Sequence, residues 1–400
     1  MSRPLRLYII AGEQSGDALG AALIRALKRR AGGEVRLKGV GGEGMAAAGL
    51  ESLYPLSEVA VMGIAAVARR LPAIIKRVHE TVEDAVSFSP DGVVIIDSPE
   101  FTHPIARRIR RRLPDVPIVD YVCPSVWAWR PGRARKMVGY IDRVLCLLPF
   151  EPAALEKLRG PEGTYVGHPL IEHAPAIRAA DSEGLARRLG ISSGRPVLVV
   201  LPGSRRSEVE RLMQPFGRAV AAILAKQGDV GLILPVVESV RPLVETKLAS
   251  WPARPHLVAG EADKFAAFAL AQAALAASGT VTLELALAGS PMVVAYKVDV
   301  LSYQLRHFIS APSIVLANLI LGENAFPEFI QRDCTPERLA EAVLPLLADS
   351  PERARQLAAL SRIDARLMLA GTTPSEAAAS AALETILAKK KKRGGTPVPA

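Results

Sequence analysis

The chain has 400 residues, half of them hydrophobic, and a formal net charge of +10. This length is enough for two or three domains, each with its own core. No apolar run reaches the roughly 18 residues of a membrane-spanning helix, and the first apolar stretch is too short for a signal peptide. The three widely spaced cysteines suggest neither a disulfide framework nor a zinc site. We therefore expect a helix-rich, cytoplasmic globular protein.

Half of the net charge comes from the KKKKR run Lys389–Arg393, which follows a helix predicted near Pro374–Leu387. Such a run is usually a solvated chain end, and its functional interpretation is attraction to anionic lipid or nucleic acid. Further basic clusters occur at Arg107–Arg112 and Arg130–Lys136. None is interleaved with the aromatic platforms that single-stranded nucleic acid requires, so we expect no nucleic-acid partner.

The first predicted unit is a strand at Leu5–Ile10, the turn AGEQSGDALG, and a helix that ends near Arg30. A strand, a glycine-containing turn and a helix are typical of an open parallel sheet. The glycines do not form GxGxxG. Glu13, Ser15 and Asp17 crowd the turn with acidic and hydroxyl groups, which suit sugar hydroxyls better than a pyrophosphate. The structural alternative is a helix capped by Ser15, with Asp17 in its first turn.

A helical pattern between Val61 and Val78 combines apolar and basic residues. Apolar side chains recur at helical spacing, and cations cover the other faces. An apolar stripe flanked by cations is typical of a helix on an anionic membrane, although most such stripes pack on a sheet. Pro72 lies in the middle and favours a helical pair or a lid over one straight helix.

The segment Gly92–Asp97 predicts a buried parallel strand that ends in a carboxylate. Ligands of open α/β sheets collect beyond the carboxyl ends of the strands. Asp97 is therefore a candidate general base, a hydroxyl anchor or a helix cap, and apolar surroundings would raise its pKa toward the range of base catalysis. After the next strand, Trp127 and Trp129 lie in a proline-bounded loop. Their rings either line the floor of a sugar or lipid site or close the end of the sheet by apolar packing.

A polar, alanine-rich stretch from about Glu172 to Gly194 predicts a domain boundary. We expect one domain at 1–172, a second at 173–370, and at 371–400 a C-terminal helix that packs back on the first domain, followed by the basic tail.

The strand and turn PVLVVLPGSR restart the pattern in the second half. Gly203, Ser204 and Arg205 offer backbone N–H groups, a hydroxyl and a guanidinium to a phosphate. Ser207 and Glu210 fit a capping box for the helix that follows.

The stretch from Ala274 to Val294 predicts a short strand, the turn Ser278-Gly279-Thr280, and a one-faced helix closed by Gly289. The turn places free N–H groups at a helix N-terminus, where a diphosphate is favoured. Glu284 lies one helical turn beyond Thr280 on the same face and suits the two hydroxyls of a ribose. The alternative is an ordinary helix cap followed by a solvent-facing glutamate.

Together these features describe a nucleotide-sugar enzyme, and the residues resemble those of the lipid-A-disaccharide synthases, a family of GT-B glycosyltransferases. The matching motifs follow one another from Ala11 to about Glu337: AGEQSGD, GVGGEGM, VMGI, IDSPEF, PSVWAWR, LLPFEP, VGHPL, LPGSRRSEV, SGTVTLE, PMVVAYKV and QRDCTPE. The resemblance implies an α/β fold of two facing, Rossmann-like, doubly wound domains with a cleft between them.

The resemblance also implies an inverting transfer from UDP-2,3-diacylglucosamine to 2,3-diacylglucosamine 1-phosphate. The products would be UDP and a β-1,6-linked lipid A disaccharide 1-phosphate. By this likeness Asp97 is the catalytic base. The donor-side residues would be Gly203, Ser204, Arg205, Ser278, Gly279, Thr280, Glu284, Asn318 and Gln331. The acceptor-side residues would be Glu13, Ser15, Gly16, Asp17, Ser125 and Trp127.

Because the implied substrates reside in a bilayer, we expect the protein to bind the cytoplasmic face of the inner membrane peripherally. The expected membrane contacts are Ile64, Val67, Leu71, Ile74 and Ile75. No acidic pair stands near the phosphate turn, so we expect neither a metal nor a cofactor. A homodimer is left open. The rival interpretations are a UDP-GlcNAc epimerase on the same fold and a non-catalytic, basic, membrane-binding scaffold.

Overall fold

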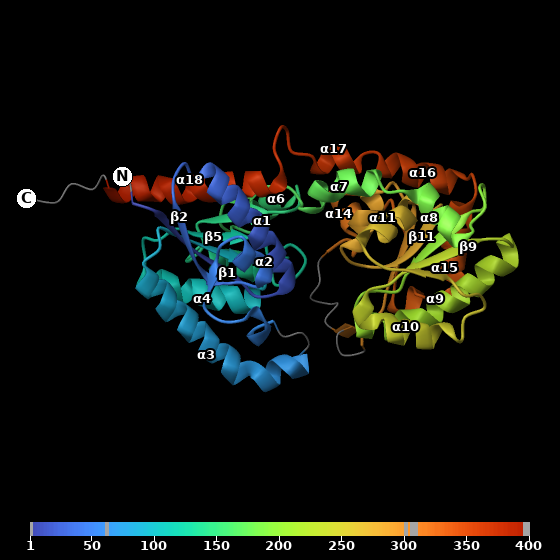
Figure 1. The fold of residues 1–400 in the computed structure, drawn as a ribbon, viewed down its shortest axis with the longest axis horizontal. Helices are drawn as coiled ribbons and strands as arrows, with labels where there is room; N and C mark the ends of the chain where they lie inside the picture. Colours follow the sequence, from blue (N-terminus) through green and yellow to red (C-terminus); the bar gives the residue numbers. More distant parts are fainter. Residues whose placement is uncertain (1–2, 61–63, 300–302, 305–310, 395–400) are drawn as a thin grey trace, which may run out of the picture. The chain divides into compact units, whose positions relative to one another are not determined.

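The computed structural model describes residues 3–60, 64–299, 303–304 and 311–394 of the chain (Figure 1). The chain forms two compact units. The first unit combines Met1–Pro169 with the C-terminal segment Leu369–Ala400, and the second comprises Leu170–Met368.

A parallel sheet of seven strands, in the order β3-β2-β1-β4-β5-β6-β7, forms the centre of the first unit. The strands are β1 (Leu5–Ala11), β2 (Val35–Val40), β3 (Glu51–Ser52), β4 (Gly92–Ile96), β5 (Ile118–Tyr121), β6 (Arg143–Cys146) and β7 (Gly163–Tyr165). Every residue of β4 is buried, as expected for a parallel strand covered on both faces. The strand order reverses between β1 and β4, where such sheets place their ligands.

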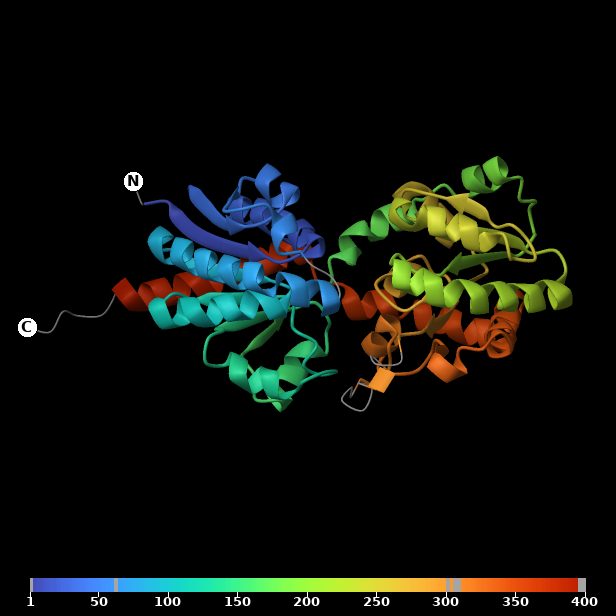
Figure 2. The same cartoon turned by 90° about the horizontal axis from the view of Figure 1, so that it is seen from below.

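Helices cover both faces of this sheet, and two separate apolar clusters show which helices share a face. The first face is covered by α3 (Ile64–Phe88), α4 (Pro99–Arg112) and α5 (Gly132–Met137). The second face is covered by α1 (Gln14–Arg30), α2 (Glu43–Ala47) and α18 (Pro374–Gly394). Figures 1 and 2 show α3 and α4 lying side by side.

Helix α18 is an integral part of the first unit, where it packs on α1, β5 and β6. A Cβ on Gly92 of β4 would lie only 2.5 Å from Ile386, so helix and sheet are in close contact there. Lys389 pairs with Asp142, and Lys390 lies 3.3 Å from Asp91. The predicted end of this helix near Leu387 was wrong, because these ion pairs continue it into the basic run.

Helix α3 is one continuous helix, so the predicted helical pair or lid at Pro72 was wrong. A proline removes a single backbone hydrogen bond and is tolerated where the other turns are held by packing. The later turns of α3 supply that packing, since Val78, Val82 and Ala85 are buried against the sheet.

The second unit is built on a parallel sheet of six strands, in the order β10-β9-β8-β11-β12-β13. The strands are β8 (Val197–Leu201), β9 (Gly231–Pro235), β10 (His256–Val258), β11 (Ala273–Ala277), β12 (Met292–Tyr296) and β13 (Glu328–Ile330). The helices include α7 (Leu170–Arg178), α8 (Ser182–Leu189), α9 (Arg206–Gln227), α10 (Arg241–Leu248), α11 (Glu261–Leu270), α12 (Val281–Leu287), α14 (Leu316–Leu321) and α15 (Pro336–Val343). This sheet reverses its order between β8 and β11. The predicted α/β class, with two parallel-sheet units, is confirmed.

Candidate functional site

In the first unit, the loops that follow β1 and β4 meet at the reversal point of the sheet. The hydroxyl of Ser98 donates to Glu13 Oε1 at 2.8 Å. The hydroxyl of Ser15 donates to Asp97 Oδ2 at 3.4 Å. The structure therefore brings Glu13, Ser15 and Asp97 together at this edge of the sheet.

The backbone holds Asp97 in an unusual conformation between strand and helix. Asp97 and Ser98 both have positive φ, at 52° and 46°, which is rare for residues other than glycine. Asp97 Oδ1 accepts the N–H of Ser98 at 2.8 Å, and α4 begins at once with Pro99. Strained residues of this kind cluster at functional sites, where the surrounding structure fixes them.

Burial raises the pKa of the Asp97 carboxyl, and the nearby charges of Glu13 and Asp120 raise it further. The N–H of Ser98 and the hydroxyl of Ser15 act in the opposite direction, because both donate to the ionised form. The net shift is upward. A carboxylate with a raised pKa is a better proton acceptor, so the site suits general base catalysis.

Asp17 and Gly16 serve the scaffold around this site. The buried carboxylate of Asp17 accepts N–H groups from Gly42, Gly44 and Met45 at 2.7 to 3.0 Å. It thereby holds the glycine-rich loop and the start of α2. A Cβ on Gly16 would lie 3.4 Å from the carbonyl oxygen of Ile96, so glycine lets α1 approach β4 closely. Of the acids in this turn, Glu13 is held near Asp97 and Asp17 faces the loop.

Trp127 fixes the loop after β5 to helix α6 (Glu151–Lys157). Its indole Nε1 donates to Glu151 Oε1 at 3.2 Å, and its ring packs edge-to-face on Phe150. Ser125 is exposed in the same loop, and its carbonyl accepts the N–H of Trp129 at 2.8 Å. The sequence placed both residues on the acceptor side, and the structure places them in the loop beyond β5, at the carboxyl edge that also carries Asp97.

Two cysteines and a glutamate gather inside this edge, an arrangement that sequence spacing did not reveal. The ligand atoms of Cys123, Cys146 and Glu151 lie within 4.8 Å of one another, because β5 and β6 are neighbours. Glu151 already accepts Trp127 and two backbone N–H groups, and burial raises its pKa to about 7. A hydrogen bond with Cys146 and burial raise the pKa of the Cys123 thiol. Metal ligation needs thiolates, so the residues fit an internal support better than a metal centre.

In the second unit, a pocket of about 590 Å³ lies at the carboxyl ends of β8, β9, β10 and β11. It brings together seven residues that the sequence assigned to the donor side: Gly203, Ser204, Arg205, Ser278, Gly279, Thr280 and Glu284. The pocket is also lined by Val237 and Gly260 from the loops after β9 and β10, and by Lys264 of α11. The sequence analysis missed these three residues, because no motif marks them.

Glu208 organises the phosphate turn after β8. Its Oε2 accepts the N–H groups of Ser204 and Arg205 at 3.1 and 3.2 Å, and its Oε1 accepts Arg205 Nη1 at 3.1 Å. The predicted capping box of Ser207 and Glu210 was therefore wrong. Helix α9 begins at Arg206, so the third helical position, which reaches back to the turn, is Glu208.

Side-chain hydrogen bonds connect the turn after β11, and helix α12 that follows it, to other segments of the unit. Ser278 Oγ donates to the carbonyl of Ile314 at 2.6 Å, and Gly279 takes a φ of 153° that other residues rarely adopt. Glu284 Oε1 accepts from Lys264 Nζ at 3.0 Å. The two side chains are about one-seventh and one-quarter exposed, so the pair lies in the pocket wall rather than in open solvent.

Asn318 and Gln331 hold loops, and neither lines this pocket. The buried amide of Asn318 exchanges two hydrogen bonds of 2.9 Å with the backbone of Phe326. The amide of Gln331 bonds in the same two-sided way to Val298, at 2.8 and 3.1 Å. Their contacts stabilise the segments around β13.

The residues expected to touch a membrane lie on α3 and fall into three groups. Leu71 and Ile75 are about half exposed, whereas Ile74 packs partly against the core. The side chains of Ile64 and Val67 lie outside the described residues. In the part of the chain that the structure describes, no helix combines the length and apolar character needed to span a bilayer.

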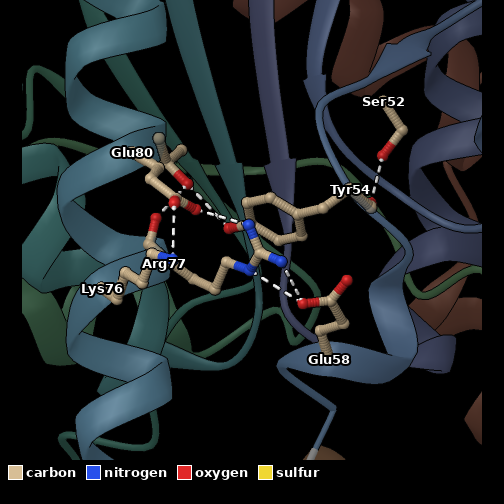
Figure 3. A network of polar contacts seen from close by, with 7 residues as sticks. Ser52, Tyr54, Glu58, Lys76, Arg77 and Glu80 are labelled. Carbon is tan, nitrogen blue, oxygen red and sulfur yellow. Dashed lines mark hydrogen bonds and ion pairs between the residues drawn. The ribbon is translucent and has the colours of Figure 1, made fainter.

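Figure 3 shows the polar contacts of Arg77 and Glu80 that anchor α3. Arg77 Nε donates to Glu58 at 2.8 Å, and its guanidinium also bonds Glu80 and lies over the Tyr54 ring at 4.7 Å. The hydroxyl of Tyr54 lies 2.7 Å from that of Thr81. These contacts fix α3 to the segment after β3.

Comparison with solved structures identifies the class of protein. A UDP-GlcNAc 2-epimerase from Neisseria meningitidis bound to UDP-GlcNAc matches with a TM-score of 0.63 and 12% identity over 96% of this chain and 100% of that one. The glycotransferase of kitacinnamycin matches with a TM-score of 0.61 and 17% identity over the same shares. At such identities the likeness shows the fold alone, which is the GT-B fold of glycosyltransferases and related epimerases.

Sequence relatives narrow this class to one family. The family model for lipid-A-disaccharide synthetase matches residues 7–382. Lipid-A-disaccharide synthases of Rhodopseudomonas palustris strain HaA2 and Bradyrhizobium diazoefficiens are 52% and 50% identical over 382 residues, covering 95% of this chain and 96% of each relative. The chain belongs to the lipid-A-disaccharide synthase family of UDP-sugar glycosyltransferases, which confirms the predicted family and the prediction of an enzyme.

Proposed function

We propose that this protein transfers the diacylglucosamine of UDP-2,3-diacylglucosamine to 2,3-diacylglucosamine 1-phosphate with inversion. The products are UDP and a β-1,6-linked disaccharide 1-phosphate. The observation that carries the proposal is the match, at about 50% identity over 95% of the chain, to proteins named lipid-A-disaccharide synthase. The geometry of the two sites supports it independently.

The pocket of the second unit fits the donor. The N–H groups and small side chains of the 278–280 turn, with the guanidinium of Arg205, suit a diphosphate whose charge grows as UDP leaves. The ion pair of Glu284 with Lys264 offers an acceptor and a donor to the ribose hydroxyls. Glu208 accepts hydrogen bonds from the Arg205 guanidinium and from two N–H groups of the turn after β8. A diphosphate that binds there must compete with this carboxylate for the same donors.

Asp97 in the first unit acts as the base. It accepts the proton of the acceptor's 6-hydroxyl while that oxygen attacks the anomeric carbon on the face opposite UDP. The bond to UDP breaks with its electron pair, which inverts the configuration. Ser15 orients the carboxylate, and Glu13 acts through Ser98 as a positioning residue.

The acyl chains of both substrates account for the exposed apolar residues of α3. Leu71 and Ile75 lie beside the exposed Arg70 and Lys76, which suits an anionic bilayer surface. We propose peripheral binding at the cytoplasmic face of the inner membrane. The homodimer and the domain boundaries at 172 and 370 stay predictions.

The test is a reconstituted reaction of the purified protein with both substrates in detergent micelles. UDP release is measured together with the disaccharide, which is detected by mass spectrometry. Formation of both products only when both substrates are present supports the proposal. UDP release without disaccharide indicates a hydrolase or a different acceptor. Interconversion of UDP-GlcNAc epimers in a parallel assay, without disaccharide, would overturn the proposal.

A further inference from the structure

The first unit contains a pocket of its own, of about 510 Å³, between α4 and α5. Two basic clusters that the sequence analysis left without a function converge on it. Its lining holds four cations, Arg107, Arg130, Arg133 and Lys136, but only one carboxylate, Glu100. The arginines, the lysine and the glutamate of the lining carry a net formal charge of +3.

The single carboxylate cannot neutralise these cations. Glu100 pairs with Arg133 and lies 3.4 Å from Arg130. The guanidinium of Arg107 lies over the ring of Tyr140 at 5.3 Å, which orients it without removing its charge. Lys136 is exposed, and no ion pair of Lys136 occurs within the described ranges. The pocket thus has unneutralised positive charge for an anion.

Buried groups keep the pocket wall in place. His103, which is 3% exposed, places Nδ1 3.0 Å from the Tyr140 hydroxyl. Its Nε2 lies 3.2 Å from Asp120 Oδ2, although not in hydrogen-bond geometry. Both His103 and Tyr140 line the pocket. An aromatic wall held by buried polar contacts is a preformed surface against which the cations are arranged.

The pocket begins directly beside the proposed base. Pro99 and Glu100 line it and form the first turn of α4, two and three residues after Asp97. Consecutive Cα atoms are about 3.8 Å apart, so the Cα atoms of Asp97 and Glu100 lie within roughly 11 Å of each other. A sugar ring that carries a phosphate fits within such a distance. On the same face of the sheet, α3 carries the exposed Leu71 and Ile75.

We propose that this pocket binds a phosphate monoester, and that the monoester is the 1-phosphate of the acceptor sugar. Guanidinium groups match phosphate oxygens in pairs, and a lysine adds a point charge. An acceptor held here by its phosphate presents the opposite side of its ring toward Asp97. The assignment to the acceptor rests on the proposed function, whereas phosphate binding itself does not. An anionic lipid headgroup offers the same chemistry and is the competing source.

The first arm of the test measures phosphate binding without catalysis. Glucosamine 1-phosphate is titrated into wild-type protein, the double variant Arg107→Ala/Lys136→Ala, and the control Arg36→Ala, which removes an exposed cation of β2 outside the pocket. We expect roughly tenfold weaker binding by the double variant only, and no pocket-dependent binding of glucosamine. Equal binding by all three proteins, with unchanged thermal unfolding, overturns the phosphate site.

The second arm separates the two sources of phosphate. With the acceptor in neutral-detergent micelles, we expect the double variant to show an acceptor KM raised about tenfold, with an unchanged KM for the UDP donor. Flotation with vesicles of phosphatidylcholine and phosphatidylglycerol should match that of wild type. Lost flotation with an unchanged acceptor KM assigns the pocket to a lipid headgroup and overturns the acceptor assignment. If wild-type protein forms no disaccharide, the proposed function fails, and the titration still decides whether the pocket binds phosphate.

Discussion

Gly12 and Ser98 approach each other so closely that a Cβ on Gly12 would lie 2.5 Å from the Cβ of Ser98. Gly12 belongs to the loop after β1, and Ser98 follows Asp97 in the turn after β4. The distance between these loops therefore sets where the Asp97 carboxylate stands relative to Ser15.

Gly12→Ala should damage activity more than stability. The added methyl group must push the two loops apart, which costs about 1–3 kcal/mol and displaces Asp97. We expect kcat to fall at least tenfold, since small misplacements of catalytic groups have large effects. Gly33→Ala is the matched control, because a Cβ there meets no atom within 4 Å. Equal kcat for both variants would show that the close approach does not position Asp97.

Asp97→Asn should lower kcat by about 10²–10⁴-fold if the carboxylate is the base. The pH profile gives a second readout. Because the base must be ionised, the rate falls as pH drops, and the raised pKa of Asp97 places this fall above the range of an ordinary aspartate. Ser15→Ala removes a hydrogen bond that lowers this pKa, so the acidic limb should move to higher pH. An unmoved limb in Ser15→Ala would assign it to another group.

The same raised pKa makes a stability prediction of opposite sign to the usual aspartate. A carboxyl whose pKa is higher in the folded than in the unfolded protein stabilises the fold when protonated, and this contribution is lost as pH rises through the folded pKa. At pH 7 Asp97→Asn should therefore raise the melting temperature while it lowers activity. A lower melting temperature at pH 7 would show that hydrogen bonding outweighs burial at this carboxylate.

Glu284→Gln should raise the KM for the UDP donor about tenfold and leave the acceptor KM unchanged. Lys264→Met should have a similar effect, since it leaves Glu284 without its 3.0 Å partner. In the double variant the two losses should be less than additive, because the side chains act as one unit. The control is Lys247→Met, which removes an exposed lysine of α10. Strictly additive effects would contradict a shared role.

Asp17→Ala tests the structural role of that carboxylate against an acceptor role. It leaves the N–H groups of Gly42, Gly44 and Met45 without their partner, and we expect a loss of roughly 2–5 kcal/mol in unfolding free energy. The acceptor KM of the folded fraction should stay near that of wild type. A raised acceptor KM with unchanged stability would return Asp17 to the acceptor side.

The combination of Leu71→Ser and Ile75→Ser should weaken flotation with anionic vesicles by tenfold or more, because both exposed side chains lose their apolar contact with the bilayer. Activity on acceptor in micelles should change less. Leu357→Ser, at a comparably exposed leucine of α16 (Pro351–Leu360) in the second unit, is the control. If the control variant loses as much flotation as the double variant, α3 is not a specific membrane contact.

The predicted donor-side residues that the structure brings into one pocket are those whose positions depend on nearby parts of the chain. The Ser278–Thr280 turn and Glu284 lie within a single strand–turn–helix unit, so periodicity alone set their spacing. Gly203 and Arg205 follow their strand in the same way, and strand order then brought the two turns into one pocket.

The contacts that sequence reasoning did not predict depend on distant partners. Asp17 looks functional beside Glu13, yet the N–H groups that occupy it come from residues 42–45. Lys264 enters the donor pocket from α11, where no local pattern marks it. Pro72 signals a break, but burial of the later turns of α3 outweighs one lost hydrogen bond. The contacts of these residues depend on charge, packing and strand order across the whole unit, and a short sequence motif does not reveal them.

The position of α18 has a consequence for how the chain acquires its structure during synthesis. Helix α18 covers β4, β5 and β6 of the seven-stranded sheet, with Ile386 against Gly92. The strands of this sheet are synthesised before the second unit, whereas α18 is synthesised after it. Helices α1 and α2 cover part of the same face early, but the part under α18 stays uncovered until the second unit has been translated. Domains usually fold in the order in which they leave the ribosome, N-terminal first. Here the second unit can be complete while the first still exposes the apolar residues that α18 covers, a surface that a chaperone would bind.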